Sequence, residues 1–390
     1  MKVGAVGLGN RAAHVFFELK KINPNYSLVA FVDPQPIGKK FAEEKNIFPN
    51  KEFSSLEEML NKENLDLLIV GSPNHLYLEH IQRGLEAGVT IFAEKPIVAN
   101  EEQTWKLAEL IKKYGKDKVL VGLVLRYSKH ARSIRKLMKE DALGKIISLE
   151  ASEHIMPWHG GFFMRNWRRK TSYSGGFILE KCCHDLDFYS MIVGCRPTKV
   201  ASFGGRNAFV AAQSPALHGE IDLDVYQEYN LKGWESKEQV FDSDADIVDH
   251  QVAIIEYENG ATLAFHTNMK VPDEFRRFAI IGTKGMVEGD FVRGYLTAHN
   301  SHTGKKIFDE NFGAAFQQGT KGHYGADQLM LTDINNHFLN QSTNSLPVGV
   351  VDCMEAGLVA MKIDESRETN QIIDLTDIWK KLDNYNLQND

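Results

Sequence analysis

The sequence predicts an α/β protein in which a doubly wound parallel sheet of the Rossmann type precedes a second domain of α+β architecture. Three observations favour this fold class. Short apolar strands alternate with helical segments in the first third of the chain, a glycine-rich turn follows the first strand, and longer alternating strands dominate afterwards. The length of 390 residues exceeds what one ordinary core supports, so two domains are expected.

The first third of the chain predicts alternating strands and helices joined by short connections. Apolar, β-branched runs predict strands at residues 2–6, 28–33, 65–70, 89–93 and 119–125. Helical spacing predicts helices at residues 13–20, 36–45, 55–61 and 101–114, with a further helix ending at residue 87. Such an order is typical of a parallel sheet, whose strands all end at one rim where ligands bind.

A glycine-rich turn, G-x-G-x-x-A, directly follows the first strand. Gly7 allows the tight turn, Gly9 lets the backbone approach a pyrophosphate, and the small Ala12 lets the helix pack on the strand. The helix amino terminus offers free N–H groups and a partial positive charge. We therefore expect Gly7, Gly9, Asn10 and Arg11 to bind the cofactor.

The second strand ends in an acidic residue, Asp33. This residue lies roughly 20 positions beyond the glycine turn, where a carboxylate meets the adenosine ribose 2′-OH. A carboxylate there repels a 2′-phosphate, so NAD is favoured over NADP. The alternative is a turn aspartate preceding Pro34.

The strand at residues 89–93 ends in Glu94, Lys95 and Pro96. Because proline cannot donate to a sheet ladder, the strand stops there and leaves Glu94 and Lys95 at the ligand-binding rim. The alternative is a solvated Glu–Lys pair in an ordinary loop. Polar side chains follow the preceding strand as well, and we expect them at the same rim: Ser72, Asn74 and His75.

The pattern changes near Leu125, where we expect the domain boundary between residues 1–125 and 126–390. A basic helix at 128–139 precedes strands at 146–153, 198–203, 251–256, 262–267 and 277–281. Glu258-Asn259-Gly260 predicts a hairpin, so the second sheet should be large and mainly antiparallel, with helices on one side. Residues 205–247 are polar and irregular, which indicates an excursion from this sheet rather than a third domain.

A second polar segment follows the pair Gly175-Gly176 and continues as a helix to about residue 193. Glu180, His184 and Asp187 stand at i, i+4 and i+7, so they share one helix face. A carboxylate one turn from an imidazole can orient it for general acid–base catalysis. Two alternatives remain: a surface ion pair, or a metal site that lacks a third ligand at suitable spacing.

Taken together, the glycine turn, S-P-N-H, A-E-K-P and G-G-x-x-x-E-x-x-x-H-x-x-D resemble the Gfo/Idh/MocA family of oxidoreductases. The resemblance implies a bound nicotinamide dinucleotide, hydride transfer at a hydroxyl of a sugar or cyclitol, and a subunit interface on the open sheet of a homodimer or homotetramer. By position, Lys95 and His184 match the catalytic lysine and histidine, and Glu180 stands where the family usually has Asp. The resemblance also implies substrate contacts at Arg126, Tyr127, Trp167 and His323.

The implied reaction assigns a role to each of these groups. His184 takes the hydroxyl proton with Glu180 holding it in position, while Lys95 stabilises the developing oxygen charge and Glu94 anchors its loop. Two other activities remain open. One is a glycosidase that uses NAD for transient redox chemistry, and the other is a regulator that binds the cofactor without catalysis.

Composition excludes several other classes of function. A formal charge of −7 gives no reason to expect nucleic acid or an anionic membrane as partner, and no apolar run is long enough to span a bilayer. The four cysteines form no C-x-x-C pair, so reduced thiols and a cytoplasmic location are expected.

Overall fold

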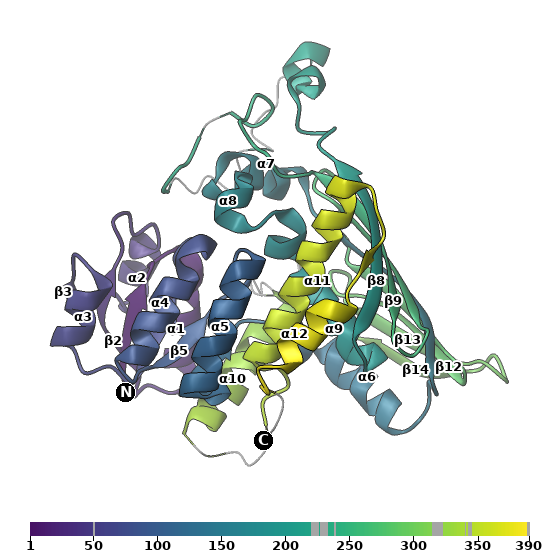
Figure 1. The fold of residues 1–390 in the computed structure, drawn as a ribbon, viewed down its shortest axis with the longest axis horizontal. Helices are drawn as coiled ribbons and strands as arrows, with labels where there is room; N and C mark the ends of the chain where they lie inside the picture. The colour runs from purple at the N-terminus through teal and green to yellow at the C-terminus, as the bar shows by residue number, and fades with distance from the viewer. Residues whose placement is uncertain are drawn as a thin grey trace.

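The computed structural model describes residues 1–49, 51–219, 226, 233–237, 239–313, 323–339, 341 and 345–387. Two sheets form the framework, and helices fill the space between them (Figure 1). Both the α/β fold class and the expected pair of sheets are confirmed.

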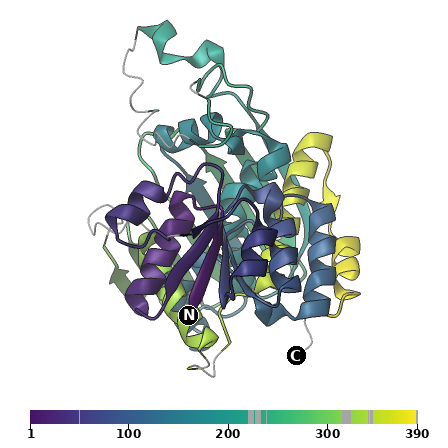
Figure 2. The same cartoon turned by 90° about the vertical axis from the view of Figure 1, so that its left-hand side faces the viewer.

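The first sheet is parallel and has six strands in the order β3-β2-β1-β4-β5-β6. Its strands are β1 (Lys2–Val6), β2 (Ser27–Val32), β3 (Lys51–Glu52), β4 (Leu67–Val70), β5 (Thr90–Ala93) and β6 (Val119–Val121). Helices lie on either side of it (Figure 2). They are α1 (Asn10–Ile22), α2 (Lys39–Glu44), α3 (Leu56–Lys62), α4 (Tyr77–Glu86) and α5 (Glu101–Tyr114).

Burial explains why these strands could be predicted. Every residue of β4 and of β6 is buried, because helices cover both faces of the sheet, and such strands read as continuous apolar runs. Two strands differ from the prediction. The two-residue strand β3 was not predicted, because both of its residues are polar and exposed. The β6 strand stops at Val121 instead of continuing to Leu125, because the chain turns into the 3₁₀ helix η3 (Val124–Tyr127).

The second sheet has nine strands in the order β14-β13-β12-β11-β7-β10-β9-β8-β15. Neighbouring strands are antiparallel except for β7 and β10, which run parallel. The predicted hairpin joins β9 to β10, and its Gly260 has a φ of +83°. The strands are β7 (Ile146–His154), β8 (Pro197–Gly205), β9 (His250–Tyr257), β10 (Thr262–Asn268), β11 (Arg277–Gly282), β12 (Gly285–Asp290), β13 (Tyr295–Asn300), β14 (Lys306–Asn311) and β15 (Ile373–Asp374).

Helices cover one face of this second sheet. Two of them, α9 (Phe177–Val193) and α11 (Val350–Thr369), pack against each other and against β7 and β8 (Figure 1). The remaining helices of this half are α6 (Lys129–Lys139), α7 (Pro157–Arg165), α8 (Thr171–Ser174), α10 (Ala326–Phe338) and α12 (Thr376–Asp383). The opposite face exposes apolar side chains along its strands: Ile147, Phe203, Val252, Ile254 and Ile281.

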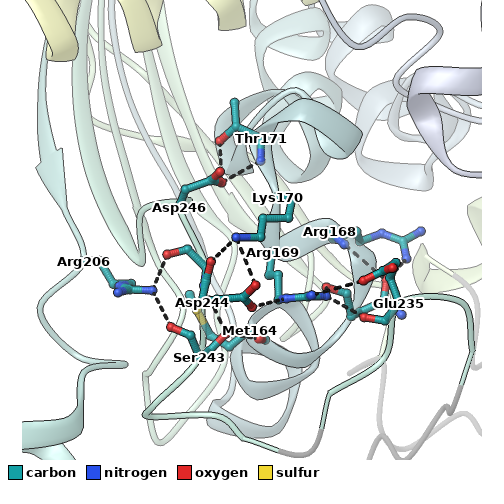
Figure 3. A network of polar contacts seen from close by, with 12 residues as sticks. Met164, Arg168, Arg169, Lys170, Thr171, Arg206, Glu235, Ser243, Asp244 and Asp246 are labelled. Atoms are coloured by element: carbon teal, nitrogen blue, oxygen red, sulfur yellow. Dashed lines mark hydrogen bonds and ion pairs between the residues drawn. The ribbon is translucent and has the colours of Figure 1, made fainter.

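The excursion at 205–247 is tied to the helical layer by a polar network (Figure 3). The guanidinium of Arg169 is almost fully buried and binds Asp244, with 2.6 Å between Nε and Oδ1. The N–H of Thr171 donates to the Asp246 carboxylate, and Arg206 donates to the carbonyl oxygens of Ser243 and Ala245. Two short 3₁₀ turns lie in the described part of the excursion, η5 (Ala211–Gln213) and η6 (Pro215–His218). Residues 220–225, 227–232 and 238 lie outside the described part.

Two further features concern the whole described chain. Each of the four cysteines has a free thiol, and three of them are buried. Among the described residues, no helix is both long enough and apolar enough to cross a membrane.

Candidate functional site

The glycine turn after β1 packs against the turn after β4. Gly7 has a φ of +80°, and a Cβ added there would lie 2.3 Å from the backbone nitrogen of Ser72, so only glycine fits. Gly9 precedes α1, which Asn10 begins, and no side chain caps the first turn of that helix. The uncapped N–H groups at the carboxyl end of β1 fit the phosphates of a dinucleotide.

Asp33 follows β2 directly and lies beside the glycine turn. Its Oδ1 accepts the N–H of Gln35 at 2.7 Å, and the backbone of Leu8 also hydrogen-bonds its carboxylate. Burial raises the pKa of Asp33 despite these two bonds. The carboxylate therefore stands at the position predicted for a ribose contact.

The side chain of Arg11 is engaged with protein groups. Its Nε donates to Glu94 at 2.8 Å, while Nη1 and Nη2 bind the Asp327 carboxylate at 2.9 and 2.7 Å. The predicted cofactor contact of Arg11 would therefore use its backbone N–H. Arg11 instead joins three elements: the glycine turn, the lysine segment after β5, and α10 of the second half.

Lys95 and Glu180 bring the two halves of the chain together. Lys95 Nζ donates to the backbone carbonyl of Glu180 and lies 4.0 Å from its Oε1. The Glu180 carboxylate accepts from Asn74 Nδ2 at 2.5 Å and from Arg168 Nε at 2.6 Å. Burial opposes ionisation of Glu180, but the charges of Lys95 and Arg168 outweigh it and hold its pKa below the ordinary value.

His184 does not make the hydrogen bond with Glu180 that the i, i+4 spacing predicts. Both oxygens of Glu180 are taken by donors from other elements, Asn74 and Arg168. Neither ring nitrogen of His184 has a hydrogen-bond partner among the described residues. Burial, followed by the positive charge of Lys95, lowers the pKa of His184 well below its ordinary value, so the imidazole is neutral near pH 7.

His323 lies beside His184. Their ring centroids are 5.5 Å apart in a T-shaped arrangement, and His323 Nδ1 lies 3.1 Å from Asp327 Oδ2. Trp167 is also placed here, since the guanidinium of Arg168 lies over its ring at 4.1 Å.

Arg126 and Tyr127, for which the resemblance implies substrate contacts, are both buried. Arg126 forms a buried two-point ion pair with Asp187, with bonds of 2.9 and 2.6 Å, and also donates to Asp352. Tyr127 is buried, and its hydroxyl has no partner among the described groups. The Arg126–Asp187 pair holds η3 against α9, so in this structure its visible role is structural.

The remaining rim residues also have protein partners. Ser72 Oγ lies 2.9 Å from His80 Nδ1. The ring of His75 stacks on Trp234 and makes a tilted contact with Tyr173. Asn74 donates to the Ser174 carbonyl as well as to Glu180. In the described part of the chain, no group of three His, Cys, Asp or Glu side chains is arranged to hold a metal ion.

Sequence reasoning assigned no contacts to two residues that shape this site, although it identified the segments that carry them. Arg168 anchors Glu180, although only its neighbour Trp167 was predicted as a contact. Asp327 pairs with His323 at i, i+4, the same spacing that drew attention to Glu180 and His184. Applying that spacing rule at His323 would have found Asp327.

Two family models match this chain. One, described as "Oxidoreductase family, NAD-binding Rossmann fold", matches residues 1–123, and the GFO/IDH/MocA C-terminal domain matches residues 131–288. Among curated proteins, the chain is similar to the "Putative oxidoreductase YteT" of Bacillus subtilis. The two are 24% identical over 374 residues, which cover 84% of this chain and 87% of that protein.

Solved structures share the fold across almost the whole chain. A levoglucosan dehydrogenase in complex with NADH and levoglucosan has a TM-score of 0.74 and 16% identity, covering 96% of this chain and 99% of that one. The myo-inositol 2-dehydrogenase from Lactobacillus plantarum has a TM-score of 0.70 and 18% identity, with coverage of 96% and 99%. At these identities the likeness shows a common fold.

Proposed function

The chain belongs to the Gfo/Idh/MocA oxidoreductase family, and we propose that it transfers a hydride between a nicotinamide dinucleotide and a secondary hydroxyl of a sugar or cyclitol. The observation that carries this proposal is the meeting of Lys95 with α9. A cation from the nucleotide-binding half reaches the helix that presents a buried, neutral His184. A neutral imidazole can accept the hydroxyl proton, and a cation can stabilise the oxygen anion that forms.

Each side chain of the site has its own role in the proposed reaction. The nicotinamide, when bound, accepts or returns the hydride. His184 takes the hydroxyl proton on one ring nitrogen, which is possible because the imidazole is neutral and both nitrogens lack described partners. Lys95 stabilises the negative charge that develops on the substrate oxygen. Glu180 keeps Lys95 and Arg168 in place, and Glu94 binds Arg11 next to the same segment.

We propose NAD rather than NADP as the cofactor, held by the glycine turn and by the rim residues Ser72, Asn74 and His75. Asp33 supports this choice, because its half-buried carboxylate at the end of β2 would repel a 2′-phosphate. Asp33→Ser should reduce the preference for NAD over NADP, measured as the ratio of the two kcat/KM values. An unchanged ratio would reject the assignment.

The halves of the chain take different roles in this proposal. Residues 1–125 bind the dinucleotide, while residues 126–390 bind substrate near Trp167 and His323 and form the subunit contact. The open face of the second sheet supports the last point, since Phe203 is 67% exposed and Ile254 is 54% exposed there. We propose a homodimer or homotetramer built on this face, which sedimentation of wild type and Ile254→Glu can test.

The test of function is an assay with cyclitols and sugars that includes myo-inositol and levoglucosan, with reduced nicotinamide and product read together. Lys95→Ala and His184→Ala should still bind NAD but lose turnover by roughly 10²- to 10⁴-fold. Lys106→Ala is the matched control, because Lys106 pairs only with Glu102 on the surface of α5. Turnover equal to wild type in either site variant would refute the proposed roles. Product formed without net reduced cofactor would favour transient redox chemistry.

A further inference from the structure

The two histidines of the site differ in their access to water. His184 is only 3% exposed, whereas the side chain of His323 is 28% exposed. Their rings are in T-shaped contact, with 5.5 Å between centroids. A proton taken by the inner imidazole therefore has the outer imidazole as its neighbour on the way to solvent.

His323 is held by a partner that is itself fixed. Asp327 is buried, and its two carboxylate oxygens lie 3.1 and 3.3 Å from His323 Nδ1. Arg11 binds the same carboxylate with two nitrogens and Glu94 with the third. Arg11, which follows the glycine turn of the other half, thus holds Asp327, and Asp327 orients His323. The Asp327 carboxylate is also an anion that stabilises the protonated form of His323.

The surroundings of His184 disfavour keeping a proton there. Burial lowers the pKa of His184 well below its ordinary value, and the groups that lower it further are Lys95, His323, Arg276 and Lys181. Both oxygens of Glu180 are already bound to other donors. Burial also lowers the pKa of His323, and Arg11 and Lys181 act in the same direction, but the Asp327 carboxylate in contact with this ring opposes them. A protonated imidazole is therefore more stable at His323 than at His184.

We propose that His323, positioned by Asp327 and Arg11, receives the substrate proton from His184 and passes it to water. The inference rests on the proposed function. In the oxidation direction, the C–H electron pair leaves as hydride to the cofactor and the O–H proton moves to His184. It then moves through one bridging water to His323 and finally to solvent, so both imidazoles return to the neutral state. Reduction runs the same path in reverse.

Removing the outer imidazole tests the relay. His323→Ala should lower kcat roughly ten- to hundredfold while leaving KM for NAD nearly unchanged, and added imidazole should restore much of the rate. His337→Ala, near the end of the helix α10 that follows His323, is the control. Its kcat should equal that of wild type and should not change when imidazole is added. A normal kcat in His323→Ala, or a lowered kcat that imidazole does not restore, would overturn the relay. If wild type turns over no alcohol in the panel, the proposed function itself fails.

A second measurement needs no turnover. In the free protein, histidine-selective NMR should show that Asp327→Asn lowers the pKa of His323, because the anion that stabilises the imidazolium is lost. The resonance is assigned by its disappearance in His323→Ala. Asp333→Asn, a half-exposed aspartate of α10 paired with Arg132, should leave the titration unchanged. Equal pKa values of His323 in wild type and Asp327→Asn would contradict the inferred positioning.

Discussion

Glu180 and His184 stand one turn apart on α9 and are equally buried, at 4% and 3% exposure, yet their surroundings are opposite. The Glu180 carboxylate binds Asn74 and Arg168 and lies near Lys95, whereas His184 has no hydrogen-bond partner among the described residues. Glu180 therefore joins elements of the two halves, whereas His184 is left free to react. The difference shows that buried polar groups on one helix face can serve stability and chemistry separately.

The largest effect should come from replacing the unpartnered imidazole. His184→Leu has nearly the same side-chain volume, and kcat should fall by roughly 10²- to 10⁴-fold because the proton acceptor is lost. The free energy of unfolding in urea should stay the same or rise by about 1 kcal/mol, since a buried polar group without a partner is removed. A marked loss of stability would mean that His184 has an essential structural contact.

Replacing Glu180, one turn before His184 on α9, should instead lower the stability of the protein. Glu180→Leu leaves Asn74 and Arg168 without their acceptor and removes the anion near Lys95, so the free energy of unfolding should fall by about 3 kcal/mol. Glu102→Leu, at an exposed pair on α5, is the control and should change stability by less than about 0.5 kcal/mol. If the two glutamate variants unfold alike in urea, the anchoring role of Glu180 is wrong.

The stabilisation that Glu180 contributes to the folded protein should weaken as pH falls, which is a smaller effect. The folded protein lowers the pKa of Glu180, chiefly through Lys95 and Arg168 acting against burial. The stabilisation is therefore fully present above the unfolded pKa of about 4.3 and is lost as pH falls through the lower folded value. Wild type should exceed Glu180→Gln in unfolding free energy at pH 7, and the gap should narrow by up to about 1.4 kcal/mol per pH unit within that acidic window. A gap that is constant with pH would contradict this linkage.

Local sequence predicted five of the six strands of the first sheet, because helices bury them on both faces, whereas the short, exposed β3 was not predicted. The second sheet was predicted less completely. Five of the six residues of β14 are exposed, so this strand has no apolar alternation to detect. Helix α11 buries residues around most of its circumference, and its sequence therefore lacks the one-sided pattern of a surface helix.

For the site, prediction from sequence has a different limit. Gly7, Asp33, Lys95, Glu180 and His184 were all identified as candidates from strand ends, spacing and resemblance. The hydrogen bonds and ion pairs of the site were not identified, because they join distant segments: Arg11 and Asp327, for example, are 316 positions apart in the chain. Spacing shows which side chains share a helix face, but domain packing decides that Glu180 binds Asn74 and Arg168 rather than His184.

The most direct test of the central claim is a crystal structure of the protein with NADH and a bound polyol. We expect the nicotinamide ring between the Lys95 segment and the face of α9 that carries His184, with the reacting hydroxyl within hydrogen-bond reach of both side chains. A dinucleotide bound away from the glycine turn, or a nicotinamide ring remote from His184, would contradict the account.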